Sequence, residues 1–148
     1  MNIKRATLAD LDEVSRLFDL YRQFYEQPAD LDKARDYIEA RLSNDESVIY
    51  LATDDEGIGL GFTQLYATFC SVAAAPIWIL YDLYVDAGVR KGGVGTALMN
   101  RAKKLAEDSG AVRIQLETAV DNTTAQSVYE ALGYERDTAF YNYSLAIK

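Results

Sequence analysis

The sequence predicts a single domain that mixes helices and strands, and three observations support this. The chain has 148 residues, a size at which one hydrophobic core is typical. Its hydrophobic content of 49% and charged content of 26% are those of a globular protein that can bury a core. Strand-like alternation and helical periodicity follow one another without a repeat, a linker or a low-complexity stretch. We therefore expect residues 1–148 to form one mixed α/β domain.

The first half of the chain is expected to form three strands and two helices. Alternation and β-branched or aromatic side chains predict strands at residues 2–6, 47–53 and 58–72. Apolar residues spaced by three and four positions predict helices over residues 7–27 and 30–42. Thr7 suits the start of the first helix, because its hydroxyl can accept from an amide of the first turn. The connection at 54–57 predicts a hairpin between the second and third strands.

The second half is expected to alternate strands and helices. Apolar runs predict strands at residues 77–85 and 112–119, of which the first should be central. Helical periodicity and glycine stop signals predict helices over residues 94–109 and 122–132. Residues 134–147 predict a bent strand or a hairpin broken near Asp137. The predicted order is strand, helix, helix, a β meander, two strand–helix units and terminal strands.

The amino-acid composition excludes several kinds of chemistry. The chain has no histidine and one cysteine, Cys70. This excludes Ser-His-Asp and Cys-His nucleophiles and zinc sites made of cysteine and histidine. We expect no metal site, and chemistry performed by carboxylates, tyrosines, the backbone or a cofactor.

The net charge of −8 bears on the partners of the protein. It argues against nucleic-acid binding, which needs a basic face, and favours a cationic small molecule or a basic peptide. The alternative is that the acidity only maintains solubility. The chain has a single cysteine, and it shows neither a signal-peptide pattern nor an apolar run of the roughly 20 residues that span a bilayer. We therefore expect a cytoplasmic protein without a membrane partner.

A glycine-rich turn, Arg90 to Thr96, lies between a predicted strand and a predicted helix. Unpaired amides and the helix dipole at such a turn can bind a phosphate, although an ordinary connecting turn is the alternative. The ATP/GTP P-loop does not fit, because Thr96 follows Gly95 without the phosphate-binding lysine. The dinucleotide fingerprint fits poorly, because its third small position falls on Leu98, although Glu117 could imitate the ribose ligand.

Two motifs in this half resemble those of the GNAT family of N-acetyltransferases. Residues 83–98 resemble the family's acetyl-CoA motif, an Arg-x-x-Gly-x-Gly turn after an apolar strand, matched at Arg90, Gly93 and Gly95. The second motif is matched, in order, at Asn122, Ala125, Tyr129, Leu132, Gly133 and Tyr134. The resemblance covers about residues 80–136, and the correct separation of two motifs makes it specific. It implies a three-layer α/β/α sandwich around a mixed, mostly antiparallel sheet.

The resemblance also implies how acetyl-CoA would be bound. Its pyrophosphate would lie beside Arg90 on the backbone amides of Lys91, Gly92, Gly93, Val94, Gly95 and Thr96. Its pantetheine arm would pair, like an added strand, with the main chain of Leu83, Tyr84 and Val85. One face of the following helix, carrying Asn122, Ala125 and Tyr129, would look toward the cofactor.

Tyr129 is implied as the residue nearest the leaving sulfur. A tyrosine pKa of about 10 exceeds a thiol pKa of about 8.5, so full proton transfer would be uphill by roughly 2 kcal/mol. We therefore favour hydrogen-bond stabilisation of the thiolate over its complete protonation. The alternative role for Tyr129 is a core aromatic of its helix.

An amine acceptor must lose a proton before it attacks a thioester, and without histidine the base should be a carboxylate or a water that it orders. Glu117 is the first candidate and Asp82, inside an apolar run, the second. Tyr21 and Tyr25, with Asp82, are candidate contacts to the acceptor through charge and cation–π interaction. The alternatives are a structurally paired or solvated carboxylate and ordinary helix-core tyrosines.

These observations predict an acetyl-CoA-dependent N-acetyltransferase. It would move an acetyl group directly to a primary amine of a small molecule, polyamine- or amino-acid-like, or of a basic peptide. A non-catalytic acyl-CoA-binding sensor or interaction module and a nucleotide-dependent oxidoreductase are the alternatives. Homodimers are common in the family, and the tyrosine-rich segment 140–143 could pair across an interface.

Overall fold

The structure, a computed structural model, describes residues 1–90 and 92–148, which fall into two compact units, 1–116 and 117–148. The first unit contains a five-stranded sheet in the order β1-β2-β3-β4-β5. Its strands are β1 (Asn2–Arg5), β2 (Val48–Thr53), β3 (Gly59–Cys70), β4 (Ala75–Val85) and β5 (Ile114–Gln115). Its helices are η1 (Leu8–Asp10), α1 (Leu11–Phe24), α2 (Leu31–Ser43), η2 (Ala87–Val89) and α3 (Val94–Asp108). The second unit contains α4 (Thr123–Ala131).

The sheet is mixed and mostly antiparallel, as the resemblance to the family implied. β1, β2, β3 and β4 pair antiparallel in chain order, and β4 pairs parallel with β5. The strand predicted at 112–119 is in the right place but is much too long. Ile114 and Gln115 form the strand opposite Trp78 and Ile79, preceded by two backbone hydrogen bonds to β4, Val112 N to Pro76 O at 3.0 Å and Trp78 N to Arg113 O at 3.2 Å. A run of apolar residues remains a strand only while its backbone groups have a partner, and in this ladder the pairing ends at Gln115.

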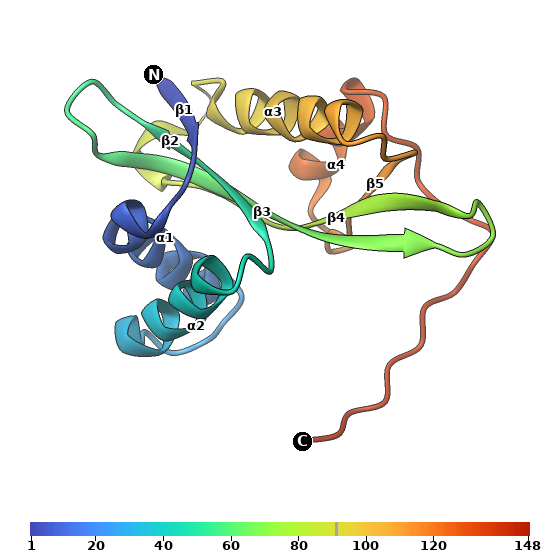
Figure 1. Ribbon diagram of the computed structural model, residues 1–148, viewed down its shortest axis with the longest axis horizontal. Coiled ribbons are helices and arrows are strands. Elements are labelled where there is room, and N and C mark those ends of the chain that lie inside the picture. Colours follow the sequence, from blue (N-terminus) through green and yellow to red (C-terminus); the bar gives the residue numbers. More distant parts are fainter. Residues whose placement is uncertain (91) are drawn as a thin grey trace. The chain divides into compact units, whose positions relative to one another are not determined.

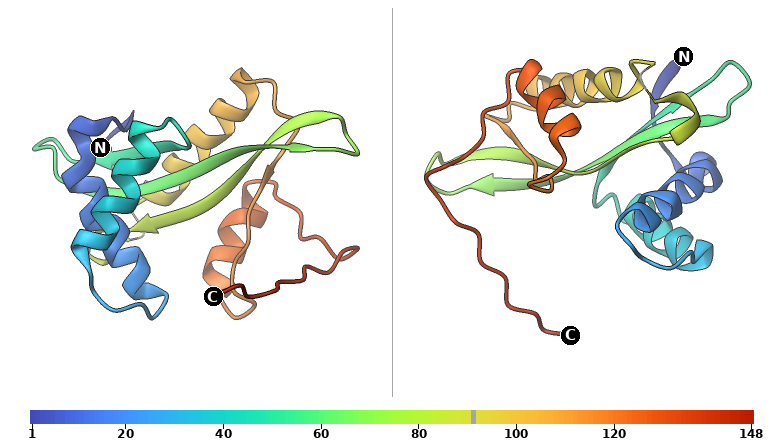
Figure 2. Two further views of the ribbon diagram at one scale, coloured as in Figure 1. Left: turned by 60° about the horizontal axis from the view of Figure 1, so that its bottom comes forward. Right: turned by 180° about the vertical axis from the view of Figure 1, so that it is seen from behind.

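Helices cover both faces of the sheet in the first unit, which confirms the predicted layered arrangement there. Figures 1 and 2 show α1 and α2 on one face and α3 on the other. The core beneath α1 and α2 consists of buried apolar side chains, namely Ala6, Leu11, Val14, Leu17, Phe18, Ala34, Ile38, Ile49, Leu51 and Phe62. Each large side chain buried in this way contributes about 1.5–3 kcal/mol. The helical spacing of apolar residues in α1 and α2 therefore gives these helices their position on the sheet.

Local interactions set the start of η1, which leads directly into α1, and the end of α1. Thr7 caps η1 as a capping box, with its Oγ1 accepting from Ala9 N and its N donating to Asp10 Oδ2 at 2.9 Å. The helix ends at Phe24, three residues earlier than predicted. Glu26 has a φ of 64°, a left-handed conformation that cannot continue a right-handed helix.

The terminal strands predicted at 134–147 are wrong, because the structure describes no strand in residues 134–148. The side chains of Phe140, Tyr141 and Tyr143 are 80–91% exposed. Near the predicted break, Asp137 Oδ1 accepts from Ala139 N at 2.8 Å in a local turn. Alternating aromatic residues form a strand only beside a neighbour that pairs with their backbone, and no described strand pairs with this segment.

Candidate functional site

The site begins with an irregularity in the pairing of β3 with β4. Cys70 pairs with Ala75 and Leu65 with Leu80, but the next residue of β3, Gln64, pairs with Asp82. Tyr81 is therefore an extra residue on β4, a β-bulge that shifts the register by one. Because side chains alternate between the faces of a sheet, this shift places Asp82 on the same face as Gln64.

Asp82 is a buried carboxylate held by a chain of side chains. It is 4% exposed, and its Oδ2 accepts from Gln64 Nε2 at 2.6 Å. Gln64 is fully buried, and its Oε1 accepts from Ser47 Oγ at 2.7 Å. The backbone oxygen of Asp82 accepts from Thr63 Oγ1 at 2.8 Å. Burial raises the pKa of Asp82 above its ordinary value, and the hydrogen bonds from Gln64 and Tyr21 offset this only in part.

The candidate acceptor residues meet beside this carboxylate. Tyr21, from α1, donates its hydroxyl to the backbone oxygen of Tyr81 at 3.2 Å and also hydrogen-bonds the Asp82 carboxyl. Its ring lies edge to face with that of Tyr25, with centroids 5.1 Å apart. Burial, followed by the charge of Asp82, raises the pKa of the Tyr21 hydroxyl, which therefore stays protonated at neutral pH. The structure thus brings together the three residues predicted to contact the acceptor.

Further tyrosines near Asp82 were not predicted as site residues. The Tyr66 ring lies 5.8 Å from that of Tyr81, edge to face, and the Tyr66 hydroxyl lies 2.5 Å from that of Tyr37. The Arg41 guanidinium lies 4.4 Å from the centroid of the Tyr37 ring. Gln64 and Tyr66 are two residues apart on β3 and therefore lie on the same face of the sheet. Gln64, an amide side chain in a mostly apolar strand, was the feature of the sequence that could have indicated this cluster.

The glycine-rich turn joins β4 to α3. Gly93 has a φ of 83° at the N-cap position of α3, where a residue with a side chain would be strained. Gly93, Val94, Gly95 and Thr96 precede the first amide to bond within the helix, Ala97 N to Gly93 O at 3.0 Å. Among the residues that the structure describes, no side chain caps this end of the helix. The turn therefore presents backbone amides and the positive end of a helix dipole, which suit an anion.

Arg90 is held at the start of this turn. Its Nε donates to Val85 O at 3.0 Å, and its guanidinium lies over the rings of Tyr84 and Phe24 at 5.5 and 5.9 Å. Gly92, at the other side of the turn, donates its N to Val89 O at 3.3 Å. Lys91 lies outside the residues that the structure describes.

The residues predicted to pair with pantetheine lie on a part of β4 that is not paired with the parallel strand β5. β4 pairs with β5 only at Trp78 and Ile79, so 80–85 have strand partners on the β3 side alone within the described part of residues 1–116. An extended, amide-bearing chain can add to such an edge by main-chain hydrogen bonds. The side chains of Leu83, Tyr84 and Val85 are themselves half-buried, as residues that also pack on the sheet.

The remaining predicted site residues belong to the second unit. Asn122 is the N-cap of α4, with its Oδ1 accepting from Ala125 N at 3.2 Å, so it lies before the helix rather than within it. Tyr129 lies within α4, with its ring 6.1 Å from that of Tyr134. Glu117 is exposed and lies two residues beyond the end of β5, so it is not part of the strand on which it was predicted.

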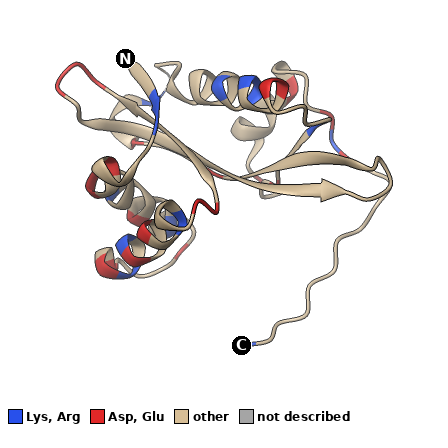
Figure 3. Ribbon diagram, viewed as in Figure 1, with Lys and Arg blue, Asp and Glu red and all other residues tan. Residues whose placement is uncertain are grey.

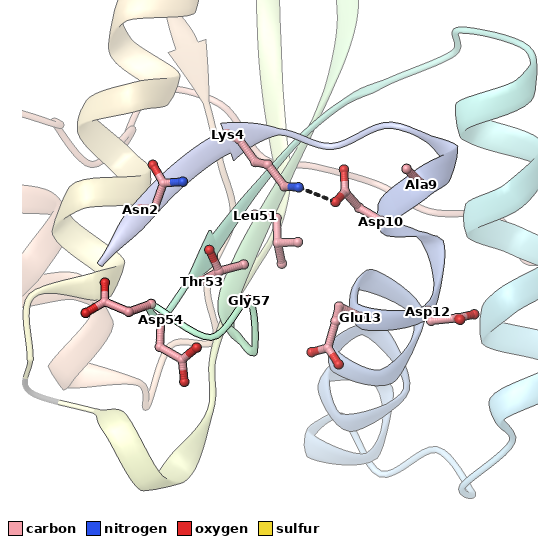
Figure 4. A pocket seen from close by; sticks show the side chains of 11 residues that line it. Asn2, Lys4, Ala9, Asp10, Asp12, Glu13, Leu51, Thr53, Asp54 and Gly57 are labelled. Carbon is pink, nitrogen blue, oxygen red and sulfur yellow. Dashed lines mark ion pairs between the residues drawn. The ribbon is translucent and has the colours of Figure 1, made fainter.

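A cavity of about 370 Å³ lies elsewhere in the first unit, between β1, the start of α1 and the loop after β2 (Figure 4). Two of its acidic side chains are bonded within the protein. Asp10 pairs with Lys4 at 2.5 Å, and Glu13 Oε2 accepts from Gly59 N at 2.8 Å. No predicted site residue lines this cavity, and we assign it no role.

Charge is unevenly distributed over the elements. Figure 3 shows acidic residues concentrated on α1, α2 and the loop after β2, whereas the strands carry few charges. Asp82 is therefore an unusual residue for its strand. Among the described residues, no helix is long and apolar enough to cross a bilayer, and no three His, Cys, Asp or Glu side chains are grouped to hold a metal ion.

Comparisons with known proteins agree on one family. A model of the acetyltransferase (GNAT) family matches residues 14–134. The uncharacterized N-acetyltransferase YhfO of Bacillus subtilis is 44% identical over 147 residues, which cover 99% of this chain and 98% of that protein. A crystal structure described as that of a "probable acetyltransferase" is also 44% identical, with a TM-score of 0.94 over 100% of this chain and 99% of that one. N-alpha-acetyltransferase 30 of Homo sapiens is 35% identical over 63 residues, 43% of this chain and 17% of that protein.

Proposed function

The chain belongs to the acetyltransferase (GNAT) family, and on that premise we propose that it transfers an acetyl group from acetyl-CoA directly to a primary amine of a small molecule or a basic peptide. The observation that carries the proposal is the buried Asp82 carboxylate beside Tyr21 and Tyr25. Burial has the largest effect on the pKa of Asp82 and raises it, and the two groups that hydrogen-bond the carboxyl, a neutral amide and a phenol, bring no positive charge to it. An ammonium ion is the ligand that complements such a carboxylate and its aromatic neighbours.

The chemistry of the turn fits acetyl-CoA. The diphosphate would be held by the amides from Gly93 to Thr96 and by the nearby charge of Arg90. The pantetheine amides would pair with the main chain of residues 83–85. When bound, acetyl-CoA supplies the thioester whose acetyl group is transferred.

We place the general base at Asp82 and keep Glu117 as the second candidate, which reverses their order. A carboxylate whose pKa is raised by burial is a more effective base near neutral pH than an exposed one. Asp82 would take a proton from the acceptor ammonium, so that the N–H bond breaks, an O–H bond forms on the carboxyl and the nitrogen keeps its electron pair. As the nitrogen forms a C–N bond to the acetyl carbon, the C–S bond would break, CoA would leave as a thiolate and the nitrogen would lose its second proton to water. The ring of Tyr21 would orient the acceptor beside the carboxyl.

We further propose that the whole chain acts as one acetyltransferase domain, in the cytoplasm and as a homodimer. The lone Cys70 suits a reducing compartment. The exposed aromatic residues near the C-terminus, Phe140, Tyr141 and Tyr143, are suitable for contact with a second copy.

A melting comparison tests the proposed function. Acetyl-CoA at 100 times its Kd is expected to raise the free energy of unfolding by about 2.7 kcal/mol. Thiol release should then require an amine, and a panel of polyamines, amino acids and basic peptides would identify the acceptor class. Stabilisation without thiol release for any acceptor would indicate a sensor module. Stabilisation by NAD or NADP but not by acetyl-CoA would indicate an oxidoreductase.

The role proposed for Tyr129 has its own test. Tyr129→Phe is expected to lower kcat about tenfold, because one hydrogen bond to the thiolate is lost. The melting temperature and the affinity for acetyl-CoA, measured by calorimetry, should change little. An undiminished kcat would remove Tyr129 from the proposed mechanism.

A further inference from the structure

Gln64 is the buried polar side chain in direct contact with Asp82, and the proposed proton transfer does not involve it. Its amide has a fixed orientation, because Ser47 Oγ donates to Oε1 at 2.7 Å and thereby turns Nε2 toward Asp82. The Nε2 atom then donates to Asp82 Oδ2 at 2.6 Å, a short hydrogen bond, and a bond to an ionised acceptor is stronger than one between neutral groups. Gln64 is fully buried and Ser47 is 8% exposed, so water does not compete for these contacts.

Tyr21 cannot hold the carboxyl in the same way. A tyrosine hydroxyl carries one hydrogen, and that of Tyr21 is also donated to Tyr81 O at 3.2 Å. The carboxyl therefore shares this donor with a backbone oxygen. Gln64, by contrast, donates one Nε2 hydrogen to Asp82 through a direct bond. The Gln64 amide is therefore the donor whose hydrogen bond to the Asp82 carboxyl is not shared with another acceptor.

Resting on the function proposed above, we propose that Gln64 is a positioning residue that holds Asp82 through Oδ2, so that Oδ1 is the oxygen that accepts the proton of the acceptor amine. A carboxylate oxygen that already receives a strong hydrogen bond is the less basic of the two. Binding at Oδ2 also fixes the plane of the carboxyl group. Gln64 thus selects the proton-accepting atom without contacting the substrate itself.

The other groups that face Asp82 are few. Tyr21 faces it from α1, and the charge of Asp82 also acts on Tyr66 of β3. Behind Tyr66 lie Tyr37 and Arg41 of α2. The pKa of Tyr66, like that of Tyr21, is raised, mainly by burial, so neither phenol ionises while the carboxyl titrates. A change in the acid limb of the activity profile would therefore report on Asp82.

The test compares Gln64→Met with Thr63→Val. Methionine has nearly the same length as glutamine but cannot donate a hydrogen bond, so the ionised form of Asp82 is less stabilised in this variant. The acid limb of kcat/KM should therefore move to higher pH by about one pH unit. Thr63→Val removes a hydrogen bond to the backbone oxygen of the same residue and leaves its carboxyl untouched. It should lower the melting temperature without moving the acid limb. A uniform loss of activity in Gln64→Met at every pH would overturn the proposal.

A second readout does not depend on catalysis. The pH titration of the Asp82 side-chain carbon by NMR, in protein without acetyl-CoA, should show the same upward displacement in Gln64→Met and none in Thr63→Val. If the carboxyl titration moves but no acceptor is ever acetylated, the positioning contact stands and the proposed function fails. Should Gln64→Met not fold, Ser47→Ala replaces it, with a smaller displacement in the same direction because the amide is then free to turn. An unchanged carboxyl titration in the folded variant would contradict the role of Gln64.

Discussion

Asp82→Asn is expected to lower kcat/KM for the amine acceptor by about 10²- to 10⁴-fold, the usual contribution of a general base. Asparagine has the same shape and can still accept from Gln64, so the side-chain network is largely retained. It cannot take a proton, and that is the function removed. The measurement is thiol release at saturating acetyl-CoA across the pH range.

Glu117→Gln is the matched comparison, because it makes the same chemical change at the other candidate base. If Asp82 is the base, the loss should occur in Asp82→Asn alone. The residual activity of that variant should no longer show the acid limb of the unmodified enzyme. A full loss in Glu117→Gln, with Asp82→Asn active, would move the base to Glu117 and leave Asp82 as a structural carboxyl.

Asp82→Asn should also be more stable than the unmodified protein at neutral pH. The pKa of Asp82 is higher in the folded protein than in the unfolded chain, because burial disfavours the ionised form. Its contribution to the free energy of unfolding is therefore intact below the unfolded pKa, about 3.9, and is lost as the pH rises through the folded pKa. Asparagine does not ionise and avoids this loss. The higher melting temperature of Asp82→Asn should accordingly disappear as the pH is lowered toward the pKa of the aspartate in the unfolded chain.

The buried network around Asp82 could not be predicted by counting along the hairpin. From the tip of the hairpin, where Cys70 pairs with Ala75, regular pairing would put Gln64 opposite Tyr81 and turn Asp82 to the other face. The bulge at Tyr81 reverses this assignment. A bulge depends on how both strands pack against their neighbours, and no residue pattern in β4 marks it. Asp82 and Gln64 were each identifiable as unusual residues of their strands, but their pairing was not.

Elements that depend on local sequence signals were predicted more successfully. The turn from Arg90 to Thr96 and the start of α3 depend on residues adjacent in the chain, so the glycine pattern predicted both. The helical spacing of α1 and α2 likewise predicted most of the buried positions, although Phe24 and Tyr25, at the end of the same apolar pattern, are exposed. The errors lie at β5 and in residues 134–147, where a strand depends on a partner that is distant in the sequence. Pairing, rather than propensity, determined those elements.

Gly93 allows the diphosphate site to be tested by charge alone. Gly93→Asp and Gly93→Asn place side chains of the same shape at the N-cap of α3, and both residues tolerate the left-handed conformation that Gly93 adopts. The carboxylate would lie close to the position proposed for the diphosphate. Two like charges about 4 Å apart repel by about 1–4 kcal/mol, depending on their exposure to water.

Gly93→Asp is therefore expected to bind acetyl-CoA about 5- to 1000-fold more weakly than Gly93→Asn, as measured by calorimetry. Because the backbone strain and the side-chain volume are matched, the difference between the two variants isolates the charge. Added salt should reduce the difference by screening it. Dephospho-CoA keeps the diphosphate and should show the same discrimination, whereas pantetheine, which has none, should not distinguish the variants. Equal affinities of the two variants for acetyl-CoA would mean that the diphosphate does not lie on the amides of this turn.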